Sequence, residues 1–285
     1  MLLVVVLISY ILNAQKIPAV TQYVPQYVSI DENLEYVSYE DRKLYLDLYR
    51  PNDYSGILPT IVVIRGGGFR VGDKKGFASM AAALAKEGFA TVCIEYRTLD
   101  EAKFPGAVFD AKSAVKWVKE HAASYHLNPD AIGVIGGSAG ALLSMTLAVS
   151  NHVEVLNPTS SFNNYKVNAA VVLEADADFL TATDDKNLIE WLGATFEEDP
   201  DLWKLASPIY HIDSTSVPML FIHGTEDTIV PIDQTTNSID RLIASNVYFE
   251  FISLPHVGHS FWGNPKYFEF TIKKAAQFFK EQLKH

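Results

Sequence analysis

Short apolar runs alternate with longer helical patterns along most of the chain. Residues 60–64 form a mostly apolar run of the kind found in buried parallel strands. Further strands are predicted at residues 90–95, 132–135, 167–173, 218–222 and 247–254. Helices are predicted at residues 77–88, 104–121, 141–149, 232–244 and 265–283. Repeated strand–helix alternation is typical of the α/β class, so we expect a doubly wound, mostly parallel sheet flanked by helices.

Two regions depart from this alternation. Residues 34–39 and 43–49 predict a pair of antiparallel strands at the start of the sheet, because the second of them alternates apolar and polar positions after a short polar turn. Residues 174–216 are acidic, contain two tryptophans and are too long for a plain connection. We expect this segment to be a small insertion of one or two short helices over the functional site.

The first residues differ in composition from the rest of the chain. Residues 2–8 are an unbroken apolar run, and residues 12–14 resemble a small-residue cleavage site. This pattern favours a secretory signal peptide at residues 1–14 over an N-terminal core strand, although no Lys or Arg precedes the run. We expect residues 15–30 to be a surface segment and residues 31–285 to form one domain.

The overall composition narrows the range of partners. The chain has 285 residues, 48% hydrophobic and 20% charged, with a net charge of −11. An acidic surface repels nucleic acid and anionic membranes, so we expect neither as a partner, whereas small neutral or polysaccharide substrates fit it. The single cysteine, Cys93, lies in an apolar strand and is interpreted as an inert core thiol. Export without an internal disulfide favours a bacterial periplasmic or extracellular location.

A serine stands at the sharpest turn that the pattern predicts. The strand at residues 132–135 ends in Gly136-Gly137-Ser138-Ala139-Gly140, and a small-residue helix follows. In such a turn the glycines let strand and helix approach closely, and the serine hydroxyl is exposed at the end of the sheet. A phosphate-binding loop is the alternative, but the Lys of a P-loop and the spacing of a dinucleotide fingerprint are missing. Ser138 is therefore a candidate nucleophile.

A serine nucleophile needs a base and an orienting acid, and candidates for both follow later strands. Asp227 follows one apolar strand, and His256 and His259 follow the next. The carboxyl ends of parallel strands meet at one edge of the sheet, where ligands bind in open α/β folds. We therefore expect these side chains to lie near Ser138.

Other residues offer alternatives for the acid and a different chemistry for the histidines. Glu226 is the first alternative acid, and Asp176 and Asp178 follow an earlier strand. His256 and His259 are also spaced like a metal-binding pair. They lack a helix and a nearby third ligand, so we expect no metal site.

Several short blocks occur in a fixed order along the chain. They are Arg65-Gly66-Gly67-Gly68-Phe69, Glu95-Tyr96-Arg97, residues 136–140, Ser207-Pro208, His223-Gly224-Thr225-Glu226-Asp227 with Val230-Pro231, and Gly258-His259-Ser260-Phe261. With these blocks, which run from about residue 34 to the end, the chain resembles the α/β-hydrolase superfamily. It is similar in particular to exported bacterial carboxylesterases of the acetyl-xylan and feruloyl esterase type. The resemblance implies Ser138 as nucleophile, His259 as general base and then acid, and Asp227 as the carboxylate that orients the imidazole.

The resemblance also implies an oxyanion hole made of the backbone N–H groups of Gly67, Gly68 and Ala139. The block before it departs from the family pattern, because Arg65 stands where a histidine is usual. That histidine generally shapes the loop, and we expect Arg65 to do the same. The alternative is that Arg65 enters the site and binds an anionic group of the substrate. Phe69 and Arg70 are further candidate substrate contacts.

These features predict a secreted serine carboxylesterase that hydrolyses short-chain acyl esters through an acyl-enzyme on Ser138. The resemblance implies acetyl or feruloyl esters of plant polysaccharide as substrates, and the reaction needs no metal or organic cofactor. Two alternatives stay open, a serine peptidase-like hydrolase and a catalytically inactive binding module on the same fold. No pattern in the chain indicates an oligomeric state.

Overall fold

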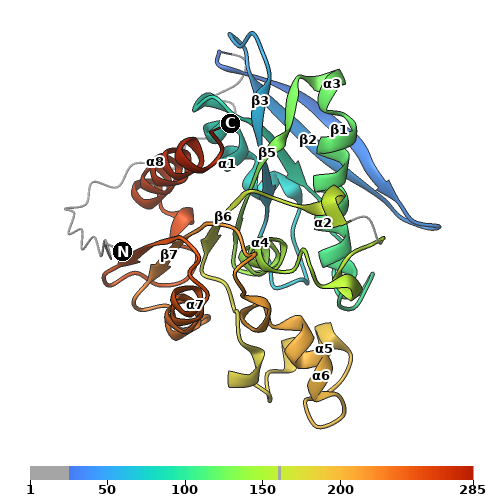
Figure 1. The fold of residues 1–285 in the computed structure, drawn as a ribbon, viewed down its shortest axis with the longest axis vertical. Helices are drawn as coiled ribbons and strands as arrows, with labels where there is room; N and C mark the ends of the chain where they lie inside the picture. Colours follow the sequence, from blue (N-terminus) through green and yellow to red (C-terminus); the bar gives the residue numbers. More distant parts are fainter. Residues whose placement is uncertain (1–25, 160–161, 285) are drawn as a thin grey trace.

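A sheet between two layers of helices organises the protein (Figure 1). The structure is a computed structural model that describes residues 26–159 and 162–284. Its strands are β1 Val28–Ser38, β2 Lys43–Pro51, β3 Leu58–Ile64, β4 Ala90–Ile94, β5 Leu127–Gly137, β6 Ala169–Leu173, β7 Met219–Gly224 and β8 Phe249–Leu254. Its α-helices are α1 Ala78–Lys86, α2 Gly106–Glu120, α3 Ala122–Tyr125, α4 Ala139–Val149, α5 Lys186–Leu192, α6 Pro200–Ala206, α7 Asp233–Ala244 and α8 Pro265–Gln282.

The strand order is β1-β2-β4-β3-β5-β6-β7-β8. β1 pairs with β2, and β2 with β4, in antiparallel fashion, while β4, β3, β5, β6, β7 and β8 are parallel. This arrangement confirms the predicted α/β fold with a mostly parallel sheet and an antiparallel start. It also brings the carboxyl ends of β5, β6, β7 and β8 side by side at one edge, which is where ligands bind in such folds.

Both faces of the sheet are covered, which explains the apolar runs in its strands. In β3, Val62 and Ile64 face a core cluster that includes α2, α4 and part of α7, while Ile61 and Val63 face a second cluster that includes α1 and α8. All residues of α4 are buried. The central strands therefore hold the site rigidly, because each is packed from both sides.

The start of the sheet differs from the sequence prediction. β1 begins at Val28 rather than at residue 34, so the last residues of the predicted surface segment 15–30 belong to the sheet, and Val28 is fully buried. Residues 1–25, with the predicted signal peptide at 1–14, lie outside the described residues. Within the described ranges, no helix has the length and apolar character needed to cross a membrane.

The segment between β6 and β7 is a small helical insertion, as predicted. It contains α5 and α6 and projects from the end of the sheet, at the bottom of Figure 1. Trp191 on α5 and Trp203 on α6 are buried and fix both helices to the core. Cys93 is also fully buried, in β4, where burial raises the pKa of its thiol, which fits the predicted inert thiol.

Candidate active site

Ser138 lies at the turn between β5 and α4 in a strained backbone conformation. Its φ is 55° and its ψ is −122°, and its N–H donates to the carbonyl of Leu173 (2.9 Å). Such a conformation costs on the order of 1–3 kcal/mol and persists only where the surroundings impose it. A Cβ on Gly136 would come within 2.1 Å of the Gly140 carbonyl oxygen, and one on Gly140 within 2.2 Å of the Ile64 carbonyl oxygen. The two glycines therefore allow the close approach that the turn requires.

His259 comes from the loop after β8 and reaches the serine. Its Nε2 is 3.0 Å from Ser138 Oγ, and its Nδ1 is 2.7 Å from Asp227 Oδ2. A carboxylate can only accept, so Nδ1 carries the proton and Nε2 is free to accept from the serine hydroxyl. The predicted nucleophile, base and acid are thus brought into one hydrogen-bonded line.

Asp227 is held ionised by its surroundings. Its Oδ1 accepts from the backbone N–H groups of Ile229 and Val230, each at 2.9 Å. Burial raises the pKa of this carboxyl, but hydrogen bonds from His223, His259 and these two N–H groups outweigh burial and hold the pKa well below its usual value. His223 was assigned no role from the sequence, yet its Nε2 lies 3.5 Å from Asp227 Oδ2.

A second carboxylate, Glu174, lies against the same imidazole. It follows β6 directly, is fully buried, and places Oε2 3.2 Å from His259 Nδ1. The sequence analysis did not single it out, although a carboxylate immediately after a buried strand is a detectable signal. Burial, together with the charge of Asp227, raises the pKa of Glu174 to about 7.

The alternative acids lie elsewhere. Glu226 pairs with His256 at 2.7 Å, and both side chains are mostly exposed, at 62% and 86%. Asp178 caps a short 3-10 helix and accepts from the Tyr210 hydroxyl (3.0 Å). Asp176 has a buried Oδ1 that finds no partner in the part of the chain that the structure describes. The geometry therefore selects Asp227, and with it His259 over His256.

Two carboxylates and a histidine lie close enough together to resemble a metal site. The ligand atoms of Glu174, His223 and Asp227 all lie within 4.8 Å of one another. His223 Nδ1 is hydrogen-bonded to the Thr235 hydroxyl (2.8 Å), and its Nε2 donates to the Val230 carbonyl (2.9 Å), so both ring nitrogens already have partners. The group is therefore interpreted as a hydrogen-bond network around the triad acid.

The loop after β3 faces the nucleophile turn. Gly67 and Gly68 have φ values of 121° and 58°, and both residues are exposed. A Cβ on Gly68 would meet nothing within 4 Å, so there is open space beside the backbone. Ala139 is the first residue of α4, and N–H groups in the first turn have no acceptor within the helix. These positions suit the predicted oxyanion hole, since a Cβ on Gly66 would lie 3.3 Å from the Ser138 Cβ and the positive end of α4 directly follows Ser138.

Arg65 is buried beneath this loop, with 4% of its surface exposed. Its Nη1 donates to the carbonyls of Gly66 (3.0 Å) and Val71 (2.7 Å) and to the Tyr96 hydroxyl (3.1 Å). The guanidinium also lies over the Tyr96 ring, 4.1 Å from its centroid. This placement favours the loop-shaping role and argues against the substrate-contact alternative.

Phe69 and Arg70, expected as substrate contacts, instead contact the insertion. Phe69 is buried and stacks on Trp191, with centroids 4.1 Å apart and planes at 9°. Arg70 forms an ion pair with Glu190, and its Nε donates to Asn187 Oδ1 (3.2 Å). Their side chains therefore connect the oxyanion loop to α5, which the sequence could not reveal because the two segments are far apart in the chain.

The aromatic ring of Trp262 lies beside the triad, although none of the sequence motifs included this residue. Its ring is partly exposed and meets the His259 ring edge to face, with centroids 6.0 Å apart. A Cβ on Gly137 would come within 2.6 Å of it. The ring therefore lies against both the base and the nucleophile turn.

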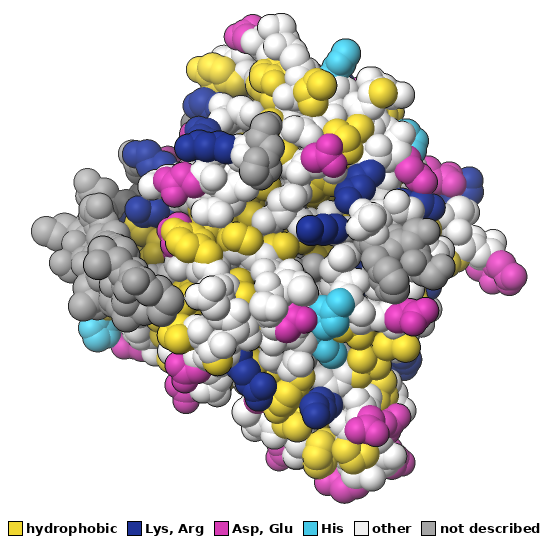
Figure 2. Space-filling model, viewed as in Figure 1, with side chains coloured by type: hydrophobic (Ala, Val, Ile, Leu, Met, Phe, Trp, Pro, Cys, Tyr) yellow, Lys and Arg dark blue, Asp and Glu magenta, His cyan; other side chains and the backbone are white. Residues whose placement is uncertain are grey.

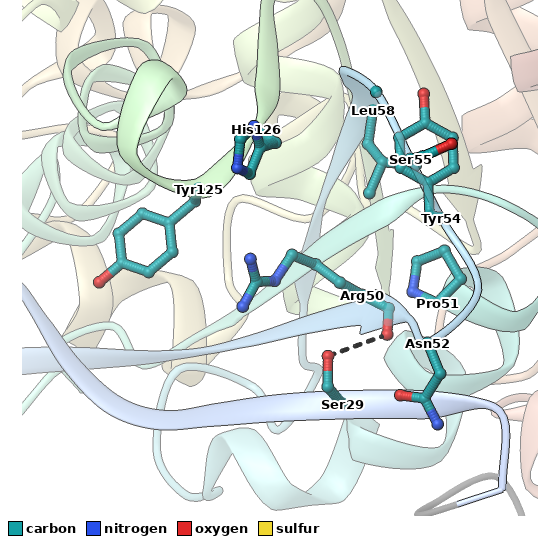
Figure 3. A pocket seen from close by; sticks show the side chains of 10 residues that line it. Ser29, Arg50, Pro51, Asn52, Tyr54, Ser55, Leu58, Tyr125 and His126 are labelled. Atoms are coloured by element: carbon teal, nitrogen blue, oxygen red, sulfur yellow. Dashed lines mark hydrogen bonds between the residues drawn. The ribbon is translucent and has the colours of Figure 1, made fainter.

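A pocket of about 440 Å³ lies at the other end of the sheet (Figure 3). It is lined by Arg50, Tyr125 and His126 among others, beside the first residue of β5, whereas Ser138 follows the last. Arg50 already pairs with Asp31 at 2.6 Å, so its charge is balanced. This pocket is separate from the triad.

A sheet of this strand order, with serine after β5, aspartate after β7 and histidine after β8, defines the α/β-hydrolase fold. Residues 46–242 match the family model described as BD-FAE. The chain therefore belongs to the BD-FAE family.

Named relatives and solved structures agree with this assignment. The chain is 31% identical to the probable carboxylic ester hydrolase LipM of Mycobacterium tuberculosis, over 81% of this chain and 56% of that protein. It is 28% identical to the esterase LipQ of the same organism, over 77% of this chain and 55% of that one. The chain thus spans a little over half the length of these curated relatives.

Among solved structures, a truncated form of a carbohydrate esterase from gut microbiota superposes with a TM-score of 0.81 at 28% identity, covering 91% of this chain and 98% of that one. Propionate-bound esterase Est2 of Thermogutta terrifontis superposes with a TM-score of 0.77 at 26% identity, covering 90% and 94%.

Proposed function

We propose that this chain is a serine carboxylesterase that works through an acyl-enzyme on Ser138. The observation that carries the proposal is the line from Ser138 Oγ to His259 Nε2 (3.0 Å) and from His259 Nδ1 to Asp227 Oδ2 (2.7 Å). A serine hydroxyl becomes a useful nucleophile when a positioned base takes its proton, and an ionised carboxylate holds that base in the required tautomer. The esterase names of the relatives support the same chemistry.

In the proposed reaction, Ser138 Oγ attacks the ester carbonyl carbon while His259 Nε2 takes the hydroxyl proton. The oxyanion that forms is stabilised by the N–H groups of Gly67, Gly68 and Ala139. The carbon–oxygen bond to the alcohol then breaks, and His259 returns the proton to the leaving alkoxide. A water molecule, deprotonated by His259, then attacks the acyl carbon. The bond from this carbon to Ser138 Oγ breaks as His259 returns the proton to Oγ, and the carboxylic acid leaves.

We propose esters of a sugar alcohol with short acyl or feruloyl groups as the substrate class. The structural neighbours include a carbohydrate esterase and an esterase with propionate or butyrate bound. Trp262 offers a partly exposed ring beside His259, and aromatic faces of this kind pack well against sugar and phenyl rings. Acetyl or feruloyl esters of plant polysaccharide fit both observations.

Export completes the proposal. The apolar run at residues 2–8 and the small residues at 12–14 support a signal peptide, cleaved to release the enzyme into the periplasm or medium. Mass spectrometry of the N-terminus of the protein recovered outside the cytoplasm tests this. An uncleaved chain confined to the cytoplasm would contradict it.

The substrate assignment is tested with purified protein on p-nitrophenyl acetate, butyrate and palmitate, beside acetylated xylan and methyl ferulate. We expect turnover of acetate and butyrate, little of palmitate, and none by Ser138→Ala. Preference for palmitate would contradict the short-acyl assignment. Faster cleavage of peptide amides than of esters would favour the peptidase alternative, and no turnover of any substrate would favour the binding module.

A further inference from the structure

Glu174 follows β6, the strand that lies between the strand before the nucleophile and the strand before the acid. Ser138, Glu174, Asp227 and His259 follow β5, β6, β7 and β8, which are adjacent in the sheet. Glu174 has a left-handed backbone conformation, with φ at 60°, and its side chain has no exposed surface. A non-glycine residue in this conformation, carrying a buried carboxylate, is an expensive arrangement that other contacts must maintain.

Those contacts tie Glu174 to the two loops that carry the base and the acid. Its Oε1 accepts from the N–H of Gly224, at the end of β7 (3.2 Å), and its Oε2 accepts from the N–H of Ser260 (2.7 Å). Oε2 is also 3.2 Å from His259 Nδ1. The imidazole nitrogen that points away from Ser138 therefore faces two carboxylates, Asp227 at 2.7 Å and Glu174 slightly farther away.

We propose that Glu174 is a second positioning carboxylate for His259, which holds the imidazole from its Nδ1 side and shares with Asp227 the stabilisation of the imidazolium. The proposal rests on the Ser138 esterase function proposed above. Nδ1–H points first at Asp227, the closer acceptor. Glu174 fixes the neighbouring residue, Ser260, and supplies a second negative charge when His259 takes the serine proton.

The titratable groups that face Glu174 are Asp227, His259 and His223. Both ring nitrogens of His223 are hydrogen-bonded, one to the Thr235 hydroxyl and the other to the Val230 carbonyl. Burial and Asp227 raise the pKa of Glu174 to about 7, against the lowering effects of the Ser260 and Gly224 N–H groups and of His259. Ionised Glu174 in turn raises the pKa of His259, which the hydrogen bond and charge of Asp227 also raise, against the lowering effect of burial.

The sign of the pH effect follows from these couplings. The reaction needs neutral His259, so kcat/KM falls as the pH drops through the pKa of His259. Removing the charge of Glu174 lowers the pKa of His259. In a plot of kcat/KM against pH, the acidic limb must therefore move to lower pH. If Glu174 only filled space, its replacement would change kcat without moving the acidic limb of the pH profile.

Glu174→Gln is the first test, and Glu226→Gln is its matched control. Both changes remove one carboxylate that pairs with a histidine of the loop after β8, but Glu226 follows β7, is exposed and contacts His256. We expect Glu174→Gln to lower kcat about 10- to 100-fold, the size typical for loss of a hydrogen bond to a charged group, and to shift the acidic limb to lower pH. Glu226→Gln should change neither kcat nor the position of the acidic limb.

The second test asks whether Glu174 supports the residual activity when Asp227 is absent. We expect Asp227→Ala to keep a weak activity, and the double variant with Glu174→Gln to fall about 10- to 100-fold below it, because neither carboxylate then faces His259 Nδ1. If Glu174→Gln does not fold, Glu174→Asp keeps the charge and should lower kcat while keeping the limb close to that of the wild type.

Covalent labelling separates the two proposals. If a fluorophosphonate does not label wild-type Ser138, the proposed function fails. If wild-type Ser138 is labelled, the esterase function stands. The role of Glu174 is then overturned if Glu174→Gln leaves the acidic limb of the pH profile in place and the double variant is as active as Asp227→Ala.

Discussion

Arg65 stabilises the oxyanion loop by contacts that a neutral histidine could not make. One Nη1 serves two carbonyls and the Tyr96 hydroxyl, and that hydroxyl donates back to the Arg65 carbonyl (3.1 Å). A guanidinium with five donors can join several acceptors at once, whereas a neutral imidazole has one donor. The replacement of the usual histidine therefore changes how the loop is held while its glycines keep their place.

Arg65→Met removes these donors and keeps most of the side-chain length. We expect a loss of about 1–3 kcal/mol in the free energy of unfolding, because two loop carbonyls and the buried Tyr96 hydroxyl lose their partner. We also expect kcat/KM to fall by a similar factor for neutral and anionic esters, since Gly67 and Gly68 would shift. Urea unfolding and initial rates on both ester types check this. A loss confined to anionic esters would instead place Arg65 in substrate binding.

Ser138, Asp227 and His259 were predictable because each follows a buried strand, and the ends of parallel strands meet. The family resemblance implied their roles, but their mutual distances were not predictable, since these depend on loop conformation. Glu174 was missed for a related reason. Its two backbone partners lie 50 and 86 residues away along the chain, so no local motif surrounds it. The sequence analysis placed it only at the start of the insertion.

The elements with regular periodicity were predicted closely, and irregular ones were not. The helix at 265–283 matches α8 to within a residue, because its apolar stripe is uninterrupted. The first strand was predicted to begin at residue 34, but β1 begins six residues earlier, at Val28. Its register with β2 shifts between Asp31 and Leu34 and again between Glu35 and Val37. Each bulge breaks the alternation of faces by which a strand is recognised.

Helix α5 supports the oxyanion loop mainly through Trp191. Its ring stacks on Phe69 and meets Phe104 edge to face, with centroids 5.2 Å apart, while its carbonyl accepts from the Phe104 N–H (3.0 Å). The neighbouring Arg70–Glu190 pair is largely exposed, and such pairs contribute little.

We therefore expect Trp191→Ala to lower the free energy of unfolding by about 3–5 kcal/mol and to lower kcat, because Phe69 loses its support. Glu190→Gln, one residue away on the same helix, should lower the free energy of unfolding far less, because exposed ion pairs contribute little. Denaturant unfolding of both variants measures the difference. Equal losses would mean that the ion pair, and not the aromatic stack, holds the loop.

On the face seen in Figure 2, basic side chains are separated by acidic and apolar ones. With a net charge of −11, this distribution is the basis for expecting uncharged substrates, and the exclusion of nucleic acid and membrane partners stays a prediction.

One buried charge makes the stability of the molecule depend on pH. Lys112 on α2 is 1% exposed, and its Nζ donates to the Asn157 side chain (2.7 Å) and to the Ser150 carbonyl (3.2 Å). Burial lowers its pKa to about 7. Above that pH the unfolded chain keeps a proton that the folded chain has lost, so stability rises with pH until the unfolded lysine also titrates.

We expect the free energy of unfolding to rise between about pH 7 and about pH 9, by at most about 1.4 kcal/mol per pH unit from this group. Lys112→Met should remove this contribution and flatten the rise. Urea unfolding of both proteins across the range measures it. An unchanged slope in the variant would show that another group is responsible.

The central claim is that His259 and Asp227 activate Ser138 as the nucleophile. Its most direct test is mass spectrometry of the protein after reaction with a fluorophosphonate, followed by peptide mapping. We predict a single adduct on Ser138 in the wild type, no adduct in Ser138→Ala, and greatly slowed labelling in His259→Ala. An adduct that persists in Ser138→Ala, or an unlabelled wild-type protein, would contradict the claim.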